Sequence, residues 1–509
     1  MSAALDTVER VTEKEAPSVD VIDDAPAAAP DHTARNNRVI WLMLAATFVV
    51  ILNETIMSVA IRKLMVDLQI TAIAAQWLST AFMLTMAVVI PITGFLLQRF
   101  NTRPIFIAAM SLFSLGTAIA AVAPGFPILL LARVVQASGT AIMLPLLMTT
   151  LMTLVPAASR GRTMGNVSIV ISVAPAIGPT IAGVILNSLS WRWIFIIVLP
   201  IALVMLLIGI RRVENVSEPE KVPIDVFSVI LSAFGFGGLV YGLTQIGQVG
   251  PVPGEIGGVN VPMWVALGVG VISLASFIAR QLLLQRKDRA LLDLRTFRFP
   301  IFTVAIVLMA ISTASLFGTI IVLPIYLQEV LHLQPLATGL LLLPGGLIMG
   351  VLAPFVGRLY DRFGPTVLVV PGSILVSAVM WALTMVTEDT SPYLLLCAHV
   401  VLSIGLALMF TPLFTAGLGA VTPHLYSHAS ALVGTVQQVA GAAGTALFVA
   451  IMSAQTATLL AGGASADAAA AGGVRMAFLA GAIISVFGVV GSFFIRKPAD
   501  APADLAFAH

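Results

Sequence analysis

Long apolar runs separated by short polar joints dominate the pattern of this chain. Fourteen runs have about the 20 residues that an α-helix needs to cross the hydrocarbon core of a bilayer. They lie at 39–60, 76–97, 104–122, 127–150, 164–186, 194–210, 226–247, 263–284, 301–325, 338–357, 365–386, 393–416, 430–453 and 474–495. Only helices and closed barrels satisfy their backbone within lipid, and these runs do not alternate as barrel strands do. The pattern predicts an all-α membrane protein with 14 transmembrane helices.

The runs form groups of six, two and six, with polar joints at 211–225 and 283–300. The first residues are rich in Pro, Ala and acids and lack the apolar segment of a signal peptide, which predicts a disordered tail. We therefore expect a cytoplasmic tail, an N-terminal six-helix half, two inserted helices with their linkers, a C-terminal six-helix half and a second cytoplasmic tail. These parts span 1–38, 39–210, 211–300, 301–495 and 496–509.

Composition supports the membrane assignment and excludes several other classes. Of the 509 residues, 59% are hydrophobic and 10% are charged, which leaves too little polar surface for a soluble protein of this length. A net charge of +2 does not indicate a nucleic-acid partner. Six His and the single Cys397 form no disulfide framework and no metal-ligand cluster. No phosphate-binding loop of the P-loop type is present in the sequence.

Lysine and arginine accumulate on one side of the predicted membrane. With the N-terminus inside, the inside segments hold 19 of them, whereas the outside segments hold Arg62, Lys63, Arg192 and Arg475. Because cytoplasmic loops carry the excess of positive residues, this split predicts both termini in the cytoplasm and the chain in the plasma (inner) membrane. One helix more or fewer would invert the later loops and remove the asymmetry.

The second run of each six-helix group ends in a similar loop. The two copies are GFLLQRFNTRP (94–104) and GRLYDRFGPTV (357–367), in which Gly, Leu, Arg and Phe recur at matching offsets. Parallel repeats with a substrate site at their interface are a known plan of transporters. The repeat therefore predicts two equivalent halves in the same orientation. The alternative is that short inside loops in general favour Gly and Arg.

These loops, and nearly the whole chain beyond residue 38, resemble the major facilitator superfamily and more closely its fourteen-helix drug:proton antiporters. The second loop is similar to the family's signature loop at Gly357, Asp361, Arg362 and Gly364. In that family the acid caps a helix end across the two halves and steadies the closed inside gate. The resemblance thus implies gating roles for Asp361 and Arg362.

The first loop departs from that signature. Gln98 stands where the family usually has Asp, and Asn101 where it usually has Gly. An uncharged amide forms weaker hydrogen bonds at a helix end than a carboxylate does. We therefore expect Gln98 and Arg99 to contribute to the gate, with Asp361 carrying more of this role.

The run 127–150 contains ARVVQASG, which resembles the family's Arg-x-x-Gln-x-x-Gly pattern at Arg133, Gln136 and Gly139. Arg133 is the only base deep inside a predicted span. At the bilayer centre its charge costs at least roughly 2.5 kcal/mol on insertion scales, so it needs a partner in protein or water. Either it tunes a nearby carboxylate for proton coupling, or it bonds loose backbone carbonyls.

The run 164–186 contains the step Gly178-Pro179, which resembles the antiporter motif of the family. Proline frees a carbonyl one turn back, and a small residue lets a neighbouring helix approach closely. The pair predicts a kinked, tightly packed helix that seals the interface against proton leak. The alternative is a generic packing kink.

The stretch ILNETIMSVAIRK (51–63) places Asn53 and Glu54 inside the first run. The family's motif there is roughly Leu-Asp-x-Thr, so the acid has moved by one residue, which is about 100° around a helix. Glu54 shares a stripe with Thr47, which we expect to face a water-filled cavity, and Asn53 shares one with Met57, which we expect to pack on a neighbour. A carboxylate in a low-dielectric cavity suits the uptake and release of a proton. The alternative is an ion pair of Glu54 with Arg62 or Lys63 near the outer headgroups.

The resemblance implies a proton-coupled antiporter that exports amphipathic, often cationic small molecules by alternating access. The alternative is an exporter of one specific metabolite, siderophore or self-made antibiotic. Neither is an enzyme, and the expected energy source is the proton gradient, with no cofactor or metal. The expected partners are small-molecule substrates and the lipid bilayer, without nucleic acid, and the chain is expected to be a monomer. Glu54 and Arg133 are the expected proton-coupling residues, and the expected substrate contacts are Asn53, Glu54, Met57, Gln136, Phe317, Tyr326 and Gln437. Of these, Met57, Phe317, Tyr326 and Gln437 could instead serve helix packing.

Overall fold

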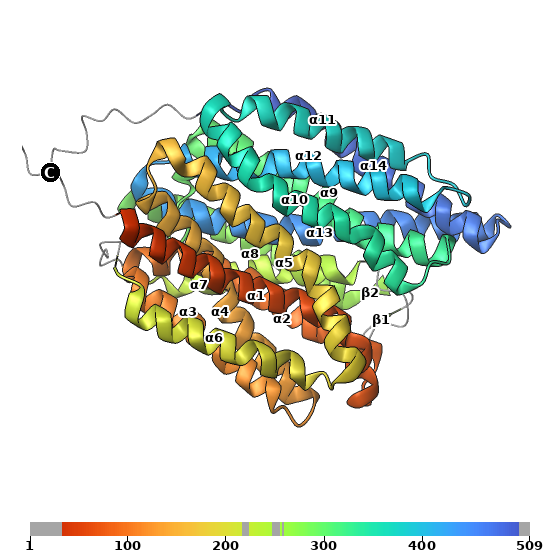
Figure 1. Ribbon diagram of the computed structural model, residues 1–509, viewed down its shortest axis with the longest axis horizontal. Helices are drawn as coiled ribbons and strands as arrows, with labels where there is room; N and C mark the ends of the chain where they lie inside the picture. Colours follow the sequence, from red (N-terminus) through yellow and green to blue (C-terminus); the bar gives the residue numbers. More distant parts are fainter. Residues whose placement is uncertain (1–32, 216–222, 247–254, 257–258, 498–509) are drawn as a thin grey trace, which may run out of the picture.

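A computed structural model describes residues 33–215, 223–246, 255–256 and 259–497 as a bundle of long helices that run along a common direction (Figure 1). Fourteen helices in this described part are long and apolar enough to cross a membrane. The predicted all-α class and the predicted number of spans are therefore confirmed. Of the predicted tails, 1–32 and 498–509 lie outside the described residues, but 33–38 belong to the first helix.

The first group of six helices comprises α1 (Thr33–Asp67), α2 (Ala72–Arg99), α3 (Thr102–Ala121), α4 (Phe126–Leu154), α5 (Arg160–Ser188) and α6 (Arg192–Arg212). The inserted pair is α7 (Val226–Gln245) and α8 (Val261–Leu284), with the two-residue strands β1 (Glu255–Ile256) and β2 (Val259–Asn260) paired antiparallel between them. The second group comprises α9 (Pro300–Ile325), α10 (Pro335–Phe363), α11 (Thr366–Leu383), α12 (Pro392–Gly419), α13 (Tyr426–Ala461) and α14 (Ala466–Ser492).

Both groups of six pack in the same way. Helix α1 packs on α5 as α9 packs on α13, and α3 lies between α4 and α6 as α11 lies between α12 and α14. The halves meet through two equivalent pairs, α5 with α10 and α2 with α13. The helices that carry the repeated loops, α2 and α10, therefore each contact the opposite half, and the predicted pair of equivalent halves is confirmed.

The inserted hairpin lies across the seam between the halves. Helix α7 packs on α2 of the first half and on α13 of the second, and α8 packs on α7. A small apolar cluster of Ala87, Val240 and Ala442 joins the three elements. Helix α8 is covered by little other than α7 and leaves most of its apolar surface exposed, as a lipid-facing helix does.

The second joint, predicted as a polar linker over 283–300, is instead a packed segment. Helix α8 continues to Leu284, and the chain then forms two short 3₁₀ turns before α9 begins at Pro300. Leu291 and Leu292 are buried, and their backbone N–H groups donate to the Gln281 side chain at 2.7 and 3.3 Å. The buried amide of Gln281 thus holds the linker in place. The charged composition of the linker did not predict this packing.

Helix α1 begins, and the described chain ends, at the same end of the bundle (Figure 1). We call this end the termini side and the other end the opposite side. Strands β1 and β2 lie at the opposite side. Because the helices alternate in direction, α2, α4 and α10 finish at the termini side, where α5 and α13 begin.

Candidate functional site

Arg133 of α4 lies at the centre of a buried polar cluster in the first half. Its Nη1 donates to Gln136 Oε1 at 2.6 Å and to Asn53 Oδ1 of α1 at 3.5 Å. Its guanidinium carbon also lies 4.1 Å from the ring centroid of Phe82 of α2, in a cation–π contact. These partners are side chains, so the arginine joins three helices rather than bonding free backbone carbonyls.

The cluster continues into α3 and depends on close packing of α3 against α4. Gln136 Nε2 donates to Thr117 Oγ1 at 2.8 Å, so both ends of this amide are used. The two helices approach at Gly116 and Gly139, where a Cβ would meet the backbone of the facing helix. The Arg-x-x-Gln-x-x-Gly pattern therefore places one charge, its acceptor and the small residue that lets α3 come close.

Glu54 follows Asn53 on α1 and is half-buried, whereas Asn53 is 1% exposed. The charge of Glu54 interacts with that of Arg133, but no hydrogen bond or ion pair involves this carboxylate among the described side chains. Lys63 is exposed, and the Arg62 side chain lies outside the described residues. The acid is therefore close enough to sense Arg133 without being bound to it.

The burial of α1 agrees with the predicted packing stripe but not with all of the predicted polar stripe. Asn53 and Met57 are buried, as expected for the packing stripe. Thr47, expected to line a cavity beside Glu54, is instead 1% exposed, and its hydroxyl has no hydrogen-bond partner in the described part of the chain. The prediction that Thr47 lines a cavity is therefore wrong, whereas the cavity-facing position of Glu54 stays a prediction.

Helix α5 packs on α1 directly beside this cluster. A Cβ at Gly178 would meet the side chain of Thr55, with the two Cβ atoms 3.1 Å apart. Thr55 Oγ1 in turn donates to the carbonyls of Leu52 at 3.0 Å and of Ala174, across the interface, at 3.5 Å. The glycine of the antiporter-like motif therefore brings α5 against the residue that follows Glu54. The Pro179 side chain lies outside the described residues.

At the termini side, Asp361 of α10 binds the first turn of α5 across the seam. Its Oδ1 accepts from the backbone N–H of Gly161, and its Oδ2 accepts from that of Arg162, both at 2.8 Å. These N–H groups have no partner within α5, and the positive end of the helix dipole favours an anion there. This contact is the one that the resemblance implied for the acid. Arg362, next to it, is exposed and lies over Phe363.

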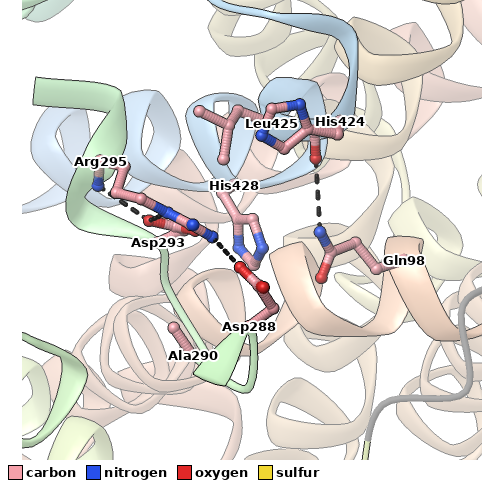
Figure 2. A pocket seen from close by; sticks show the side chains of 8 residues that line it. All are labelled: Gln98, Asp288, Ala290, Asp293, Arg295, His424, Leu425 and His428. Atoms are coloured by element: carbon pink, nitrogen blue, oxygen red, sulfur yellow. Dashed lines mark hydrogen bonds and ion pairs between the residues drawn. The ribbon is translucent and has the colours of Figure 1, made fainter. Parts of the chain in front are cut away.

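The equivalent contact of the first loop is weaker. Gln98 of α2 donates from Nε2 to the carbonyl of His424 at 3.4 Å, just before α13 begins. Arg99 is exposed and lies over Phe100. Gln98 lines a pocket of about 380 Å³ together with residues of the 285–299 linker and of the start of α13 (Figure 2). An amide donating once replaces a carboxylate accepting twice, so the two sides of the seam are held unequally.

Two further hydrogen bonds join the halves near the termini side. Arg160 Nη2 donates to the hydroxyl of Tyr426 at 3.3 Å, and Thr411 donates to Ser168 at 2.7 Å. Every hydrogen bond described between the six-helix halves lies toward this side. The structure therefore describes a transporter-like bundle whose halves are closed together at the termini side, while the Arg133 cluster lies toward the opposite side.

Three predicted substrate contacts in the second half lie apart from the cluster. Tyr326 is buried, and its hydroxyl donates to the Thr387 carbonyl. Phe317 is 37% exposed and packs against Gly441 of α13. Gln437 of α13 is half-buried. In the described part of the chain no contact brings these residues to Arg133.

Sequence reasoning missed several residues that shape the site. Thr117 holds the Gln136 amide that binds the arginine, and Arg160 bridges the seam. A base buried in a span signals that partners exist, but partners on other helices leave no local pattern. Gly161 could have been found from the sequence, because a glycine at the start of a predicted helix allows close approach of another segment. Here that segment is the loop of the other half.

The bundle of membrane-spanning helices, its two equivalent halves and the buried polar cluster define a multi-pass membrane transporter rather than an enzyme. A family model described as Major Facilitator Superfamily matches residues 43–445. The chain belongs to the major facilitator superfamily. Its members bind small-molecule substrates and sit in lipid membranes.

Relatives of the chain include proteins named for drug resistance. The lincomycin resistance protein LmrB of Listeria monocytogenes is 40% identical over 464 residues, covering 90% of this chain and 96% of that protein. The multidrug resistance protein B homolog of Mycobacterium tuberculosis is 29% identical over 405 residues, covering 79% of this chain and 74% of that protein. Among solved structures, the proton:xylose symporter XylE has a TM-score of 0.63 at 15% identity, covering 92% of this chain and 97% of that one. This last similarity concerns the fold alone.

Proposed function

We propose that this chain is a drug exporter of the plasma membrane that exchanges protons for amphipathic, often cationic small molecules, with Glu54 as the proton-carrying group. The observation that carries the proposal is the position of Glu54, half-buried beside the Arg133 cluster and without an ion-pair partner among the described side chains. The names of two relatives, for lincomycin resistance and for multidrug resistance, support the substrate class.

Competition for Glu54 gives the simplest exchange. When the carboxylate is ionised, it attracts a cationic substrate, and when it binds a proton, that attraction is lost and the substrate leaves. Arg133 carries a charge of opposite sign that interacts with Glu54, so it responds to the protonation of Glu54. Asn53 links Glu54 to Arg133, because it precedes Glu54 on α1 and accepts a hydrogen bond from Arg133 of α4.

The seam contacts supply the second requirement, alternating access. With Asp361 bound to α5 and Gln98 bound at the start of α13, the termini side is closed. Transport requires that these bonds break and that the halves close instead at the opposite side. The roles of Gln98, Arg99, Asp361 and Arg362 as gating residues, and of Gly178 and Pro179 as the seal, belong to this proposal, as does a cytoplasmic position of the termini side.

Glu54→Gln tests the proposal in vesicles that contain the purified protein. We expect the variant to insert and fold but to lose proton release induced by lincomycin or by a cationic dye. The matched control is Glu329→Gln, which removes an exposed acid just after α9 and should keep wild-type coupling. Wild-type proton release in Glu54→Gln would reject the assignment. Loss in both variants would point to a general effect of surface charge.

A further inference from the structure

A second pocket lies at the termini side, where α8 meets the linker to the second half. It has a volume of about 450 Å³ and is lined by Leu282, Gln285, Arg286, Arg295 and Arg298. Three of these five side chains are guanidinium groups. Such a lining repels cations and suits an anion with several hydrogen-bond acceptors.

The three arginines differ in their partners. Arg295 is held by Asp293 and Asp288, each at 2.5 Å, and these carboxylates raise its pKa. Arg286 and Arg298 have no acidic partner in the described part of the chain. Two positive charges therefore line the pocket without compensation, and they remain available to an anionic ligand.

The side chain of Gln285 belongs to the same wall, and its amide oxygen lies just beneath the surface. Its Oε1 is buried and has no hydrogen-bond partner in the described part of the chain. A buried acceptor without a donor costs free energy, so it suits a ligand that carries a hydroxyl beside its negative charge. Phosphate oxygens alone do not satisfy this group, because they too are acceptors.

The pocket also has an apolar flank. Leu282 and Leu283, in the last turn of α8, are 46% and 64% exposed, and Phe297 of the linker is 38% exposed. Helix α8 faces lipid, so these side chains lie where acyl chains meet the headgroup layer. A basic pocket at this level, flanked by apolar surface, is the arrangement that recognises a lipid headgroup.

We propose that this pocket binds the headgroup of an anionic glycerophospholipid such as phosphatidylglycerol. Arg286 and Arg298 bind the phosphodiester, and Gln285 accepts a hydrogen bond from the headgroup glycerol. Acyl chains lie along the exposed end of α8. The lipid is then a resident of the inserted hairpin rather than a transported substrate.

The position of Arg295 links this site to the seam. Arg295 lines both this pocket and the one in Figure 2, where its side chain binds Asp288 and Asp293 and lies near His428. A bound headgroup therefore contacts the segment that forms the wall beside the Gln98–His424 contact. The function of the inserted helices is then to hold a lipid at the border of the two halves.

The test is a lipid titration of the full chain in a neutral detergent, followed by thermal unfolding. Phosphatidylglycerol should raise the unfolding temperature, whereas phosphatidylethanolamine and inorganic phosphate at the same phosphate concentration should not. Arg286→Gln/Arg298→Gln should weaken the apparent affinity about 25-fold, because each arginine contributes a factor of about five. The matched control is Lys287→Gln/Arg289→Gln, which removes the same charge from the same segment outside the pocket lining.

Equal loss of affinity in the two double variants would overturn the proposal, because a diffuse surface charge would then explain binding. An equal effect of inorganic phosphate would overturn the lipid assignment. If Arg286→Gln/Arg298→Gln does not fold, Arg286→Lys/Arg298→Lys keeps the charge and loses the planar fork. It should then retain fewer phosphatidylglycerol molecules in native mass spectra than the control, and equal retention would reject the site.

Discussion

The carboxylate of Asp361 accepts a hydrogen bond of 2.8 Å from the backbone N–H of Gly161, which joins the end of α10 to the start of α5 across the seam. Glycine is required at both contact points. A Cβ at Gly161 would meet Asp361 itself, and one at Gly357 would meet the carbonyl of Gly161. The acid and the two glycines thus form one latch between the halves.

Asp361→Asn should open the termini side. The amide keeps one acceptor but turns its NH₂ toward the second N–H, and the negative charge at the helix N-terminus is lost. Because hydrogen bonds to a charged group contribute about 1.5–3 kcal/mol, the closed state should lose at least about tenfold in population. The rate of maleimide labelling of Ser168→Cys, in a Cys397→Ala background, measures the opening of the termini side. Ser168 is buried in the seam, so it reacts only when the halves separate. Asp389→Asn, an exposed acid, is the control, and an unchanged rate in Asp361→Asn would contradict the latch.

Gly178→Ala should weaken the packing of α5 on α1 and allow protons to leak. The added Cβ would meet the side chain of Thr55. Thr55→Ala removes the hydroxyl that is in the way, so the double variant should recover part of the lost stability, as measured by a thermal double-mutant cycle. Gly183→Ala is the matched control on the same helix, because a Cβ there meets nothing within 4 Å. Additive losses in the cycle would refute a direct contact.

Gln136→Leu should destabilise the folded protein as well as impair transport. Arg133 would keep only the longer bond of 3.5 Å to Asn53, and Thr117 would lose its amide partner. A buried donor left without its acceptor costs about 1–3 kcal/mol, so the unfolding temperature should fall. Thr140→Ser is the control, since the serine can still donate to the Gln136 carbonyl at this buried position. If Gln136→Leu lost transport while keeping its unfolding temperature, Gln136 would contact substrate rather than position the arginine.

Asp225→Asn should loosen the inserted hairpin at neutral pH. Asp225 caps α7 through Ser228 and forms a two-bond ion pair with Arg280 of α8, at 2.6 and 2.8 Å. The guanidinium of Arg280 lowers the pKa of Asp225 from 3.8 to about 2. The pair therefore stabilises the fold above about pH 4, and this contribution is lost as pH falls toward 2. Because both side chains are partly exposed, it amounts to about 1 kcal/mol or less.

Thermal unfolding of Asp225→Asn and wild type from pH 7 to pH 3 measures this effect. The difference in unfolding temperature should be constant near neutral pH and should shrink below pH 4. Asp67→Asn, an exposed acid at the end of α1, should show no such difference. A difference at pH 3 as large as the one at pH 7 would mean that Asp225 acts through shape rather than charge.

The number of spans, their all-α class and the two equivalent halves could be predicted because each follows from a local or repeated pattern. A segment in lipid must satisfy its own backbone, so an apolar run of sufficient length becomes a helix whatever its neighbours are. The limits of the helices were less predictable. Helix α1 begins at Thr33, within the predicted tail, because polar residues at a helix end project beyond the hydrocarbon core without breaking the helix.

The chemistry of the candidate site was predictable in kind and not in geometry. Arg133 and Glu54 are charged residues within apolar runs, and this contrast alone indicates a functional or paired position. The direct partner of Arg133 is nevertheless Asn53, one position before the acid, together with Phe82 of another helix. A shift of one residue turns a side chain by about 100°, and only helix packing decides which of two adjacent side chains faces the neighbour.

The sequence by itself determined that this chain crosses the membrane fourteen times, repeats a six-helix unit and carries one base and one acid within the apolar runs of its first half. Only the tertiary structure decided that Asp361 binds α5, that Gln281 holds a buried linker and that the halves meet at the termini side. The physical reason is the same in each case. Helix formation in lipid is satisfied within a segment, whereas these contacts depend on the rotation and depth of helices that are distant in the sequence.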